Sequence, residues 1–268
     1  VVSQSRTSLV IEGAGGTVVT TFTGRGFTFT GDTPTGGRIT GVTFEDDASN
    51  TIATFSGMTW QLADFYSGME NWLNGASDNP FDGSSTLWDV MAGDSYVIDA
   101  SDADTGYYMP LIGRLTDPVS FTGSDSADVM IGSSARDNLN GGRGIDGLYA
   151  GKGNDRLNGG GGEDILWAGK GKDKMTGGAG NDTFLFDGRR NENKNTIRDF
   201  TDGEDTLWIS RGAFADLTIT QVRANTRIVT DNGTKIILKN FDATDLTEDD
   251  FWFINGNSAF NILDDFMA

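Results

Sequence analysis

Residues 141–160 read GGRGIDGLYAGKGNDRLNGG, in which the pattern Gly-x-Gly-x-Asp occurs twice, nine residues apart. The same register extends over seven consecutive units, which begin at Gly123, Gly132, Gly141, Ala150, Gly159, Ala168 and Gly177. Position 6 of every unit is Asp, namely Asp128, Asp137, Asp146, Asp155, Asp164, Asp173 and Asp182. Position 8 is always apolar, namely Met130, Leu139, Leu148, Leu157, Leu166, Met175 and Phe184. A flexible linker has no reason to repeat a buried apolar position, so the array predicts a folded repeat structure.

The residue types of one unit predict a tight turn followed by a short strand. Glycines adopt positive φ, so a Gly-rich stretch turns sharply and points carbonyl oxygens inward. The Asp adds an anionic oxygen, and three extended residues follow, of which only the middle one is buried. Two units make one coil of 18 residues, so units n and n+2 stack on the same side. Two stacked turns then offer about six oxygen ligands, which suits Ca²⁺ better than Mg²⁺, zinc or copper.

Three units, GGRGIDGLY, GGGGEDILW and GGAGNDTFL, match the nonapeptide GGxGxDxUx. The sequence therefore resembles the RTX (repeats-in-toxin) proteins, and the resemblance covers about residues 123–253. It implies a calcium-bound parallel β-roll. It also implies that each ion is held by two stacked turns, through carbonyls 2 and 4 and the Asp of the first turn, and carbonyls 1 and 3 and the Asp of the second.

Carried over residue by residue, the resemblance implies three calcium sites. The first joins Gly142, Gly144 and Asp146 to Gly159, Gly161 and Asp164. The second joins Gly160, Gly162 and Asp164 to Gly177, Ala179 and Asp182. The third, on the opposite side, joins Gly151, Gly153 and Asp155 to Ala168, Lys170 and Asp173.

The two ends of the array depart from this pattern. The first units, GSDSAD and GSSARD, replace glycines with Ser and Ala, so we expect the sites of Asp128 and Asp137 to be weak or empty. The later stretch NTIRDFTDGEDTLWIS resembles the segment that follows the roll in secreted RTX proteases. That likeness implies that Asp199 and Asp205 complete the half-site left by Gly178, Gly180 and Asp182. In all, we expect about three to five ions, all Ca²⁺.

The composition excludes several classes of function. Asp and Glu outnumber Lys and Arg by 39 to 20, and the formal charge of −19 argues against nucleic acid or an anionic membrane as a partner. There is no His and no Cys, which excludes His-based hydrolases, zinc proteases and disulfides. No stretch approaches the roughly 20 apolar residues of a transmembrane segment. The N-terminal sequence also lacks the pattern of a secretory signal peptide.

Composition and periodicity predict three regions of a mostly β protein. Residues 1–122 form a β-rich or α+β domain of short antiparallel strands, with one helix near 60–74 that Thr59 caps and Gly75 ends. Residues 123–186 form the nonapeptide β-roll. Residues 187–268 form a C-terminal β cap whose strands include TLWIS, LTITQV, TRIVT and TKIILKNF, with a two-residue hairpin at TDNGT. The ending LDDFMA resembles the C-terminal signals of type I secretion substrates.

Calcium is predicted to control folding. Extracellular calcium modules have Kd values of about 10⁻⁴ to 10⁻³ M. At roughly 1 mM calcium, a site with a Kd near 10⁻⁴ M stabilises the fold by about 1.4 kcal/mol, and at cytosolic calcium by almost nothing. Three to five such sites contribute about 4–7 kcal/mol, comparable to the stability of an ordinary domain. We therefore expect a roll that is unfolded inside the cell and folded outside it.

Two functions are consistent with these features. The first is a non-enzymatic, secreted protein with a structural, adhesive or self-assembling role at the bacterial surface or in the extracellular matrix. Its partners would be calcium, together with a second copy of itself or a surface polysaccharide. The alternative is a secreted polysaccharide-active enzyme or carbohydrate-binding module carried on the roll. Its candidate carboxylates, Glu12, Glu45 and Glu70, show no helpful spacing, and we expect no catalytic residues.

Overall fold

The computed structural model describes residues 3–4, 8–12, 18–30, 33–46, 51–61, 96–99, 108–109, 117–186 and 194–253. The chain forms two compact units, Val1–Asp104 and Thr105–Ala268. The observed division therefore precedes residue 122, where the composition changes. No helix in the described ranges has the length and apolar character that a bilayer span requires.

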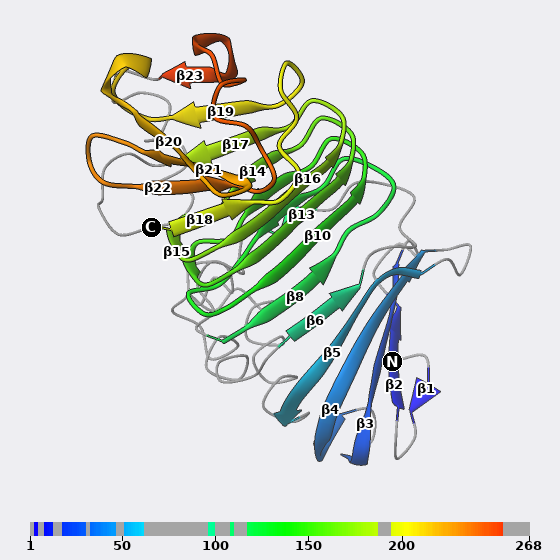
Figure 1. Ribbon diagram of the computed structural model, residues 1–268. Coiled ribbons are helices and arrows are strands. Elements are labelled where there is room, and N and C mark those ends of the chain that lie inside the picture. The colour runs from blue at the N-terminus through cyan, green and yellow to red at the C-terminus, as the bar shows by residue number, and fades with distance from the viewer. Residues whose placement is uncertain are drawn as a thin grey trace. The chain divides into compact units, whose positions relative to one another are not determined.

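The first unit is an antiparallel sheet (Figure 1). Its strands pair in chain order: β1 (Ser3–Gln4), β2 (Ser8–Glu12), β3 (Val18–Thr30), β4 (Thr33–Asp46), β5 (Thr51–Gln61) and β6 (Tyr96–Asp99). The antiparallel pairing agrees with the period-2 pattern, whereas β3, β4 and β5 are longer than expected, at 13, 14 and 11 residues. Gly24 lies at a register shift inside β3, where a bulge lets the strand continue instead of ending.

The predicted helix near residues 60–74 is only partly covered by the described residues. Thr59, expected to cap that helix, and Trp60 both lie inside β5, so the capping prediction is wrong. The extended pattern of residues 51–61 continues through Thr59 because that strand pairs with β4, where Ile39 is opposite Trp60. Residues 62–74 lie outside the described part of the chain.

The second unit contains two stacks of parallel strands (Figure 1). One stack runs β8 (Val119–Thr122), β10 (Asn138–Arg143), β13 (Arg156–Gly161), β16 (Lys174–Ala179), β18 (Lys194–Ile197) and β22 (Lys235–Leu238). The other runs β7 (Tyr108–Met109), β9 (Val129–Ile131), β11 (Gly147–Tyr149), β14 (Ile165–Trp167), β17 (Thr183–Phe186), β19 (Thr206–Ile209) and β23 (Phe251–Phe253). Within the array, partners such as Leu139 and Leu157 are one 18-residue coil apart, which is the arrangement of a parallel β-roll.

The apolar residue at position 8 of each nonapeptide fills the interior between the two stacks. All seven of these side chains are at most 2% exposed: Met130, Leu139, Leu148, Leu157, Leu166, Met175 and Phe184. Ile197 and Leu207 extend the same core beyond residue 186. These side chains form one column on each stack, and their hydrophobic burial between the stacks stabilises the roll.

The region after the array combines parallel and antiparallel strands. The strands β20 (Thr218–Val222) and β21 (Asn225–Val229) pair antiparallel, and β21 pairs antiparallel with β22. A hairpin does form around TDNGT, but its loop spans the residues between Val229 and Lys235 rather than two residues. Within this loop the N–H of Thr230 donates to the carbonyl of Thr234, so the turn itself comprises three residues, Asp231 to Gly233. The hydroxyl of Thr230 donates to Oδ1 of Asn232 and holds this turn. Two short 3₁₀ turns, Phe214–Asp216 and Glu248–Asp250, complete the region. The strand pair β12 (Lys152–Gly153) and β15 (Lys170–Gly171) lies in the turns of the array.

Candidate metal centre

The Asp at position 6 links each coil of the roll to the next. The backbone N–H of Asp146 donates a 2.8 Å hydrogen bond to Oδ1 of Asp164, and the N–H of Asp164 donates a 3.0 Å bond to Oδ1 of Asp182. On the opposite side, Asp155 donates in the same way to Asp173 at 2.9 Å. One oxygen of each carboxylate is therefore used by the main chain, which fixes the orientation of the side chain.

The second oxygen of the same carboxylates has no hydrogen-bond donor. Oδ2 is buried and unpaired in five residues of the array: Asp146, Asp155, Asp164, Asp173 and Asp182. Each of these residues is 1% exposed. An unpaired buried carboxylate oxygen is costly, and native proteins place one where an ion or another ligand binds.

Glycine carbonyl oxygens border the space around these unpaired atoms. A Cβ added to Gly160 or Gly162 would collide with the carbonyl oxygen of the corresponding residue one coil earlier, Gly142 or Gly144. These carbonyls therefore point into the gap between stacked turns. A Cβ at Gly141 would lie 2.5 Å from the carbonyl oxygen of Gly159 and against Oδ2 of Asp146. The gap is thus lined by oxygen and has room only because the residues are glycines.

The same arrangement recurs in the other two predicted sites. In the second site, Gly178 and Gly180 face the carbonyls of Gly160 and Gly162. In the third, Gly169 and Gly171 face the carbonyls of Gly151 and Gly153. In each predicted site, the carbonyls at positions 2 and 4 of the first turn therefore face the next turn. Their joint coordination of one ion with the Asp stays a prediction.

The position 1 and position 3 residues of the second turns were also predicted as ligands. The carbonyl of Gly177 lies 2.7 Å from where a Cβ of Gly159 would be, beside Oδ2 of Asp164. The carbonyls of Gly161 and Ala179 already accept backbone hydrogen bonds of 2.7 and 2.8 Å from the turn below. Each keeps a second lone pair. In the third site Ala168 is buried, and the N–H of Lys170 donates to the carbonyl of Gly151 at 2.8 Å.

In the first two nonapeptides, which begin at Gly123 and Gly132, a serine donates the hydrogen bonds that the Asp carboxylate accepts. Ser124 donates both its N–H (2.8 Å) and its hydroxyl (3.1 Å) to Oδ2 of Asp128. Ser133 donates its N–H to Oδ2 (2.7 Å) and its hydroxyl to Oδ1 (2.9 Å) of Asp137. Ser avoids the positive φ of the corresponding glycine, 111° at Gly142, so its N–H turns toward the carboxylate instead. This contact gives a physical reason to expect weak or empty sites at Asp128 and Asp137.

The other end of the array is closed by hydrogen bonds as well. Oδ1 of Asp205 accepts the N–H of Asp182 at 3.0 Å, and its Oδ2 accepts the N–H of Thr201 at 2.8 Å. The carboxylate of Asp199 accepts the N–H groups of Gly177 and Gly178 at 3.1 and 3.0 Å. Both acids therefore cap the last turn through hydrogen bonds, and their part as calcium ligands stays a prediction.

Sequence reasoning noted that Ser replaces Gly in the first two nonapeptides but did not predict the hydrogen bonds of Ser124 and Ser133, and it missed Asn195. Asn195 is buried, and its Oδ1 accepts the N–H of Asp173 at 3.2 Å, in the place of a further Asp. The separation of Asp173 and Asn195 is 22 residues rather than 18, so periodicity could not reveal the pairing. The serines carried a signal, since each replaces a glycine at position 2.

Burial of the carboxylates raises their pKa values. The loss of hydration raises the pKa of Asp146 and of Asp182 to about 7, and that of Asp155 to about 8. The negative charges of neighbouring carboxylates, such as Asp164 beside Asp146, raise these pKa values further. For Asp173 the pKa rises to about 6, again chiefly through burial. A bound cation counters both causes, because it attracts the ionised form.

The chemistry of the donor set fits calcium. Among the described residues no three acidic side chains converge on one point, so a metal here depends on backbone carbonyls together with the Asp pairs. The donors are all oxygen, as Ca²⁺ prefers, and a chain without His or Cys offers no imidazole or thiolate ligand. Fold and donor set together define this unit as a parallel β-roll of the calcium-binding class.

Comparison with known proteins agrees with that class. The family model of the RTX calcium-binding nonapeptide repeat (4 copies) matches residues 120–148 and 149–184. This part of the chain is therefore an RTX calcium-binding repeat array, and RTX repeats are typical of secreted proteins. No curated protein matches the sequence.

Several solved structures resemble parts of the chain. The AlgE6R2 subunit of the mannuronan C5-epimerase of Azotobacter vinelandii is 27% identical, with a TM-score of 0.38 over 48% of this chain and 95% of that chain. The AlgE6R3 subunit of the same enzyme is 26% identical, with a TM-score of 0.29 over 52% and 84%. The extracellular lipase LipA of Serratia marcescens is 14% identical, with a TM-score of 0.27 over 52% of this chain and 40% of the lipase.

Proposed function

We propose that this protein is a secreted, non-enzymatic calcium-binding protein whose RTX array folds when it meets extracellular calcium. The observation that carries the proposal is the set of five buried, unpaired Asp Oδ2 atoms between stacked turns. Without a cation, these carboxylates disfavour the compact roll because they are desolvated and repel one another. With calcium, the same groups become ligands and stabilise it.

The role at the cell surface or in the extracellular matrix is structural or adhesive. Among the described strands of the second unit, β20, β7 and β23 are edge strands. Such edges favour pairing with another copy. Self-assembly and binding of a surface polysaccharide are the two forms that this role takes.

The fold part of the proposal is tested by circular dichroism during a calcium titration. We expect little β structure in excess EGTA and a cooperative gain of it as calcium rises through about 10⁻⁴ to 10⁻³ M. Full β structure in EGTA would overturn the calcium-dependent folding.

The surface role is tested separately by electron microscopy of the full chain with and without calcium. Calcium-dependent filaments or sheets support assembly. A reducing-sugar assay on polysaccharides addresses the alternative, because turnover would show an enzyme.

A further inference from the structure

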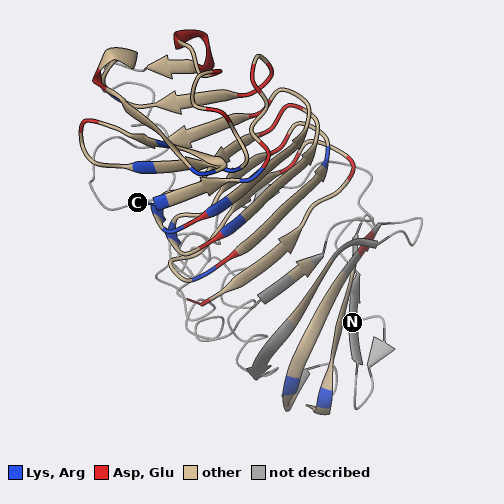
Figure 2. Cartoon of the chain, viewed as in Figure 1, with Lys and Arg blue, Asp and Glu red and all other residues tan. Residues whose placement is uncertain are grey.

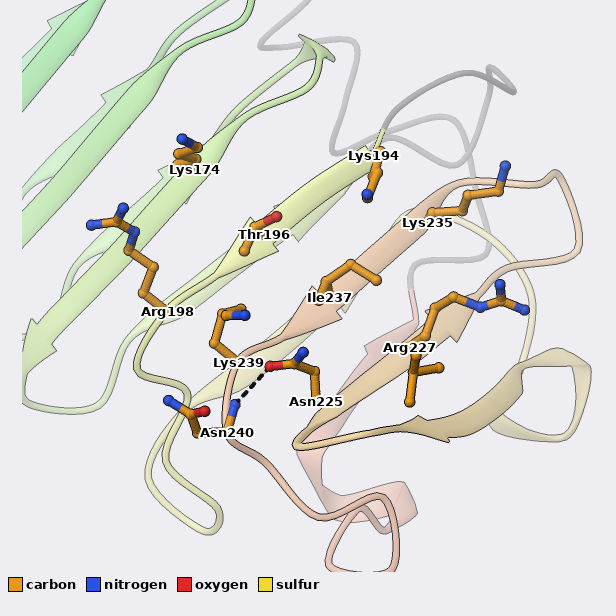
Figure 3. A pocket seen from close by; sticks show the side chains of 11 residues that line it. Lys174, Lys194, Thr196, Arg198, Asn225, Arg227, Lys235, Ile237, Lys239 and Asn240 are labelled. Atoms are coloured by element: carbon orange, nitrogen blue, oxygen red, sulfur yellow. Dashed lines mark hydrogen bonds between the residues drawn. The ribbon is translucent and has the colours of Figure 1, made fainter.

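A groove lined by cations lies on the outer face of the first stack of strands, beyond the calcium turns. It has a volume of about 940 Å³ and runs over β16, β18, β22 and β21 (Figure 3). Six cationic side chains line it: Lys174, Lys194, Arg198, Arg227, Lys235 and Lys239. A second depression beside it shares Lys174 and Arg198 and adds Arg156 from β13. The seven cations form one surface, called here the basic face.

The alternation of each strand places these cations outside. In β16, Lys174 is exposed and the next residue, Met175, is buried in the core. In β22, Lys235 is exposed and Ile236 is buried in the same way. Because parallel strands lie in register, the outward positions of neighbouring strands form rows about 4.8 Å apart.

Like charges lie next to one another in these rows. Lys194 on β18 is directly opposite Lys235 on β22. Directly opposed like charges destabilise a sheet, so this pairing opposes folding. The sequence nevertheless keeps both lysines, which is expected when an anion compensates them.

Among the described residues, no acidic side chain lines the basic face. Within the described ranges, the seven cations form no ion pair; the pair found there joins Arg143 to Asp125. Figure 2 shows acidic residues gathered in the turns of this unit, while Lys and Arg lie on strands such as β18 and β22. Screening limits each charge to about 8 Å at physiological salt, so the basic face attracts anions despite the net charge of −19.

The remaining lining residues indicate which anion fits. Amide and hydroxyl groups lie between the cations, including Thr196, Asn225 and Asn240. Such groups bind the hydroxyls of sugars. None of the described residues that line the two depressions is aromatic, so this part of the surface offers no platform on which nucleic-acid bases could stack.

We propose that the basic face binds an acidic polysaccharide whose sugar rings carry carboxylates. Such a polyuronate has one charge per ring, a repeat comparable to the strand spacing of about 4.8 Å. Arg and Lys pair with the carboxylates, and the Asn and Thr side chains bond to the ring hydroxyls. The proposal names a ligand for the adhesive role and rests on the folded array, because the face exists only when the strands stack.

The test measures binding of an oligogalacturonate, too short to gel with calcium, to the full chain at saturating calcium by isothermal titration calorimetry. The test variant is the triple replacement Lys174→Gln, Arg198→Gln and Lys239→Gln. The matched control removes three exposed arginines elsewhere: Arg25→Gln, Arg38→Gln and Arg211→Gln. We expect the wild type to bind with strong salt dependence, the test variant about tenfold more weakly, a difference of about 1.4 kcal/mol, and the control unchanged.

Further titrations distinguish a polyuronate from a neutral sugar and from other anions. A neutral galactose oligomer, a sulfated dextran oligomer, a single-stranded oligodeoxynucleotide and phosphatidylserine vesicles are titrated in the same way, and we expect each to bind more weakly. Tighter binding of any of them, or equal loss in the control variant, would overturn the proposal. Circular dichroism of every variant in calcium shows whether the array is folded, so a failure of binding is told apart from a failure of calcium-dependent folding.

Discussion

The backbone N–H of Asp146 donates a 2.8 Å hydrogen bond to Oδ1 of Asp164, and Oδ2 of both residues is buried without a partner. One carboxylate therefore has two separate tasks. Its first oxygen joins consecutive coils, and its second faces the gap that the glycine carbonyls line. This division of tasks leads to predictions in which the two oxygens are changed independently.

Replacing Asp164 with Asn tests the second oxygen. The amide keeps an oxygen for the N–H of Asp146 but removes the negative charge from the two predicted sites that share this residue. We expect the calcium midpoint of folding to rise at least about tenfold, which corresponds to about 1.4 kcal/mol. Asp125→Asn is the matched control, because Asp125 is 72% exposed and outside the turns' interior. Equal midpoints in the two variants would contradict the assignment.

Neighbouring glycines provide a second comparison. Gly162 has φ +137°, and an added Cβ would collide with the carbonyl of Gly144, whereas a Cβ on Gly161 meets nothing within 4 Å. Ala at position 162 adds backbone strain of about 1–3 kcal/mol and fills the ion's space. We therefore expect Gly162→Ala to abolish folding at calcium levels that fold the wild type. Gly161→Ala should fold almost normally, as calcium titrations followed by circular dichroism would show.

The hydrogen bonds of the second nonapeptide, which begins at Gly132, lead to a variant that should gain a calcium site. Ser133 satisfies both oxygens of Asp137. Restoring the consensus with Ser133→Gly and Ala135→Gly frees that carboxylate and permits positive φ. Equilibrium dialysis should then find one more bound calcium ion per chain. An unchanged number of ions would mean that the serine does not exclude the metal.

The raised pKa values predict how calcium binding depends on pH. The pKa of Asp146 rises from 3.8 to about 7 and that of Asp155 to about 8, so the calcium-free folded array binds more protons than the unfolded chain. Its stability is therefore highest below the unfolded value and is lost as pH rises through the folded values. Calcium must displace these protons.

We expect the calcium midpoint to increase as pH falls from about 8 to about 5, and EGTA-treated protein to gain β structure over the same range. Titrations at several pH values measure the first effect, and circular dichroism in EGTA measures the second. A midpoint independent of pH would contradict the burial of ionisable carboxylates.

The array could be predicted from local sequence because each nonapeptide repeats the same apolar and Asp positions. Position 8 faces the core in every unit, and position 6 forms the ladder of carboxylates. The sequence did not show whether Oδ2 of each Asp accepts a hydrogen bond within its own nonapeptide, since this depends on whether position 2 adopts positive φ, as Gly142 does. The contact of Asn195 with Asp173 was not predictable, because the chain leaves its regular spacing after Asp182. Asp205 was indicated only by the resemblance to the segment that follows the roll in RTX proteases.

The basic face was concealed for a different reason. Lys174, Arg198 and Lys239 are far apart in the sequence, and only the stacking of β16, β18 and β22 gathers them. The total charge of −19 argued against nucleic acid or an anionic membrane as a partner and gave no sign of a local basic surface. Net charge averages over the molecule, whereas a ligand responds to the charges within about one Debye length of it.

The central claim is that calcium occupies the gaps between stacked turns and thereby folds the array. The most direct measurement is a calcium titration of the full chain, with bound ions counted by equilibrium dialysis and β structure followed by circular dichroism. We predict that both curves rise together between about 10⁻⁴ and 10⁻³ M calcium and reach about three to five ions per chain. Full β structure in EGTA, or folding without bound calcium, would contradict the claim.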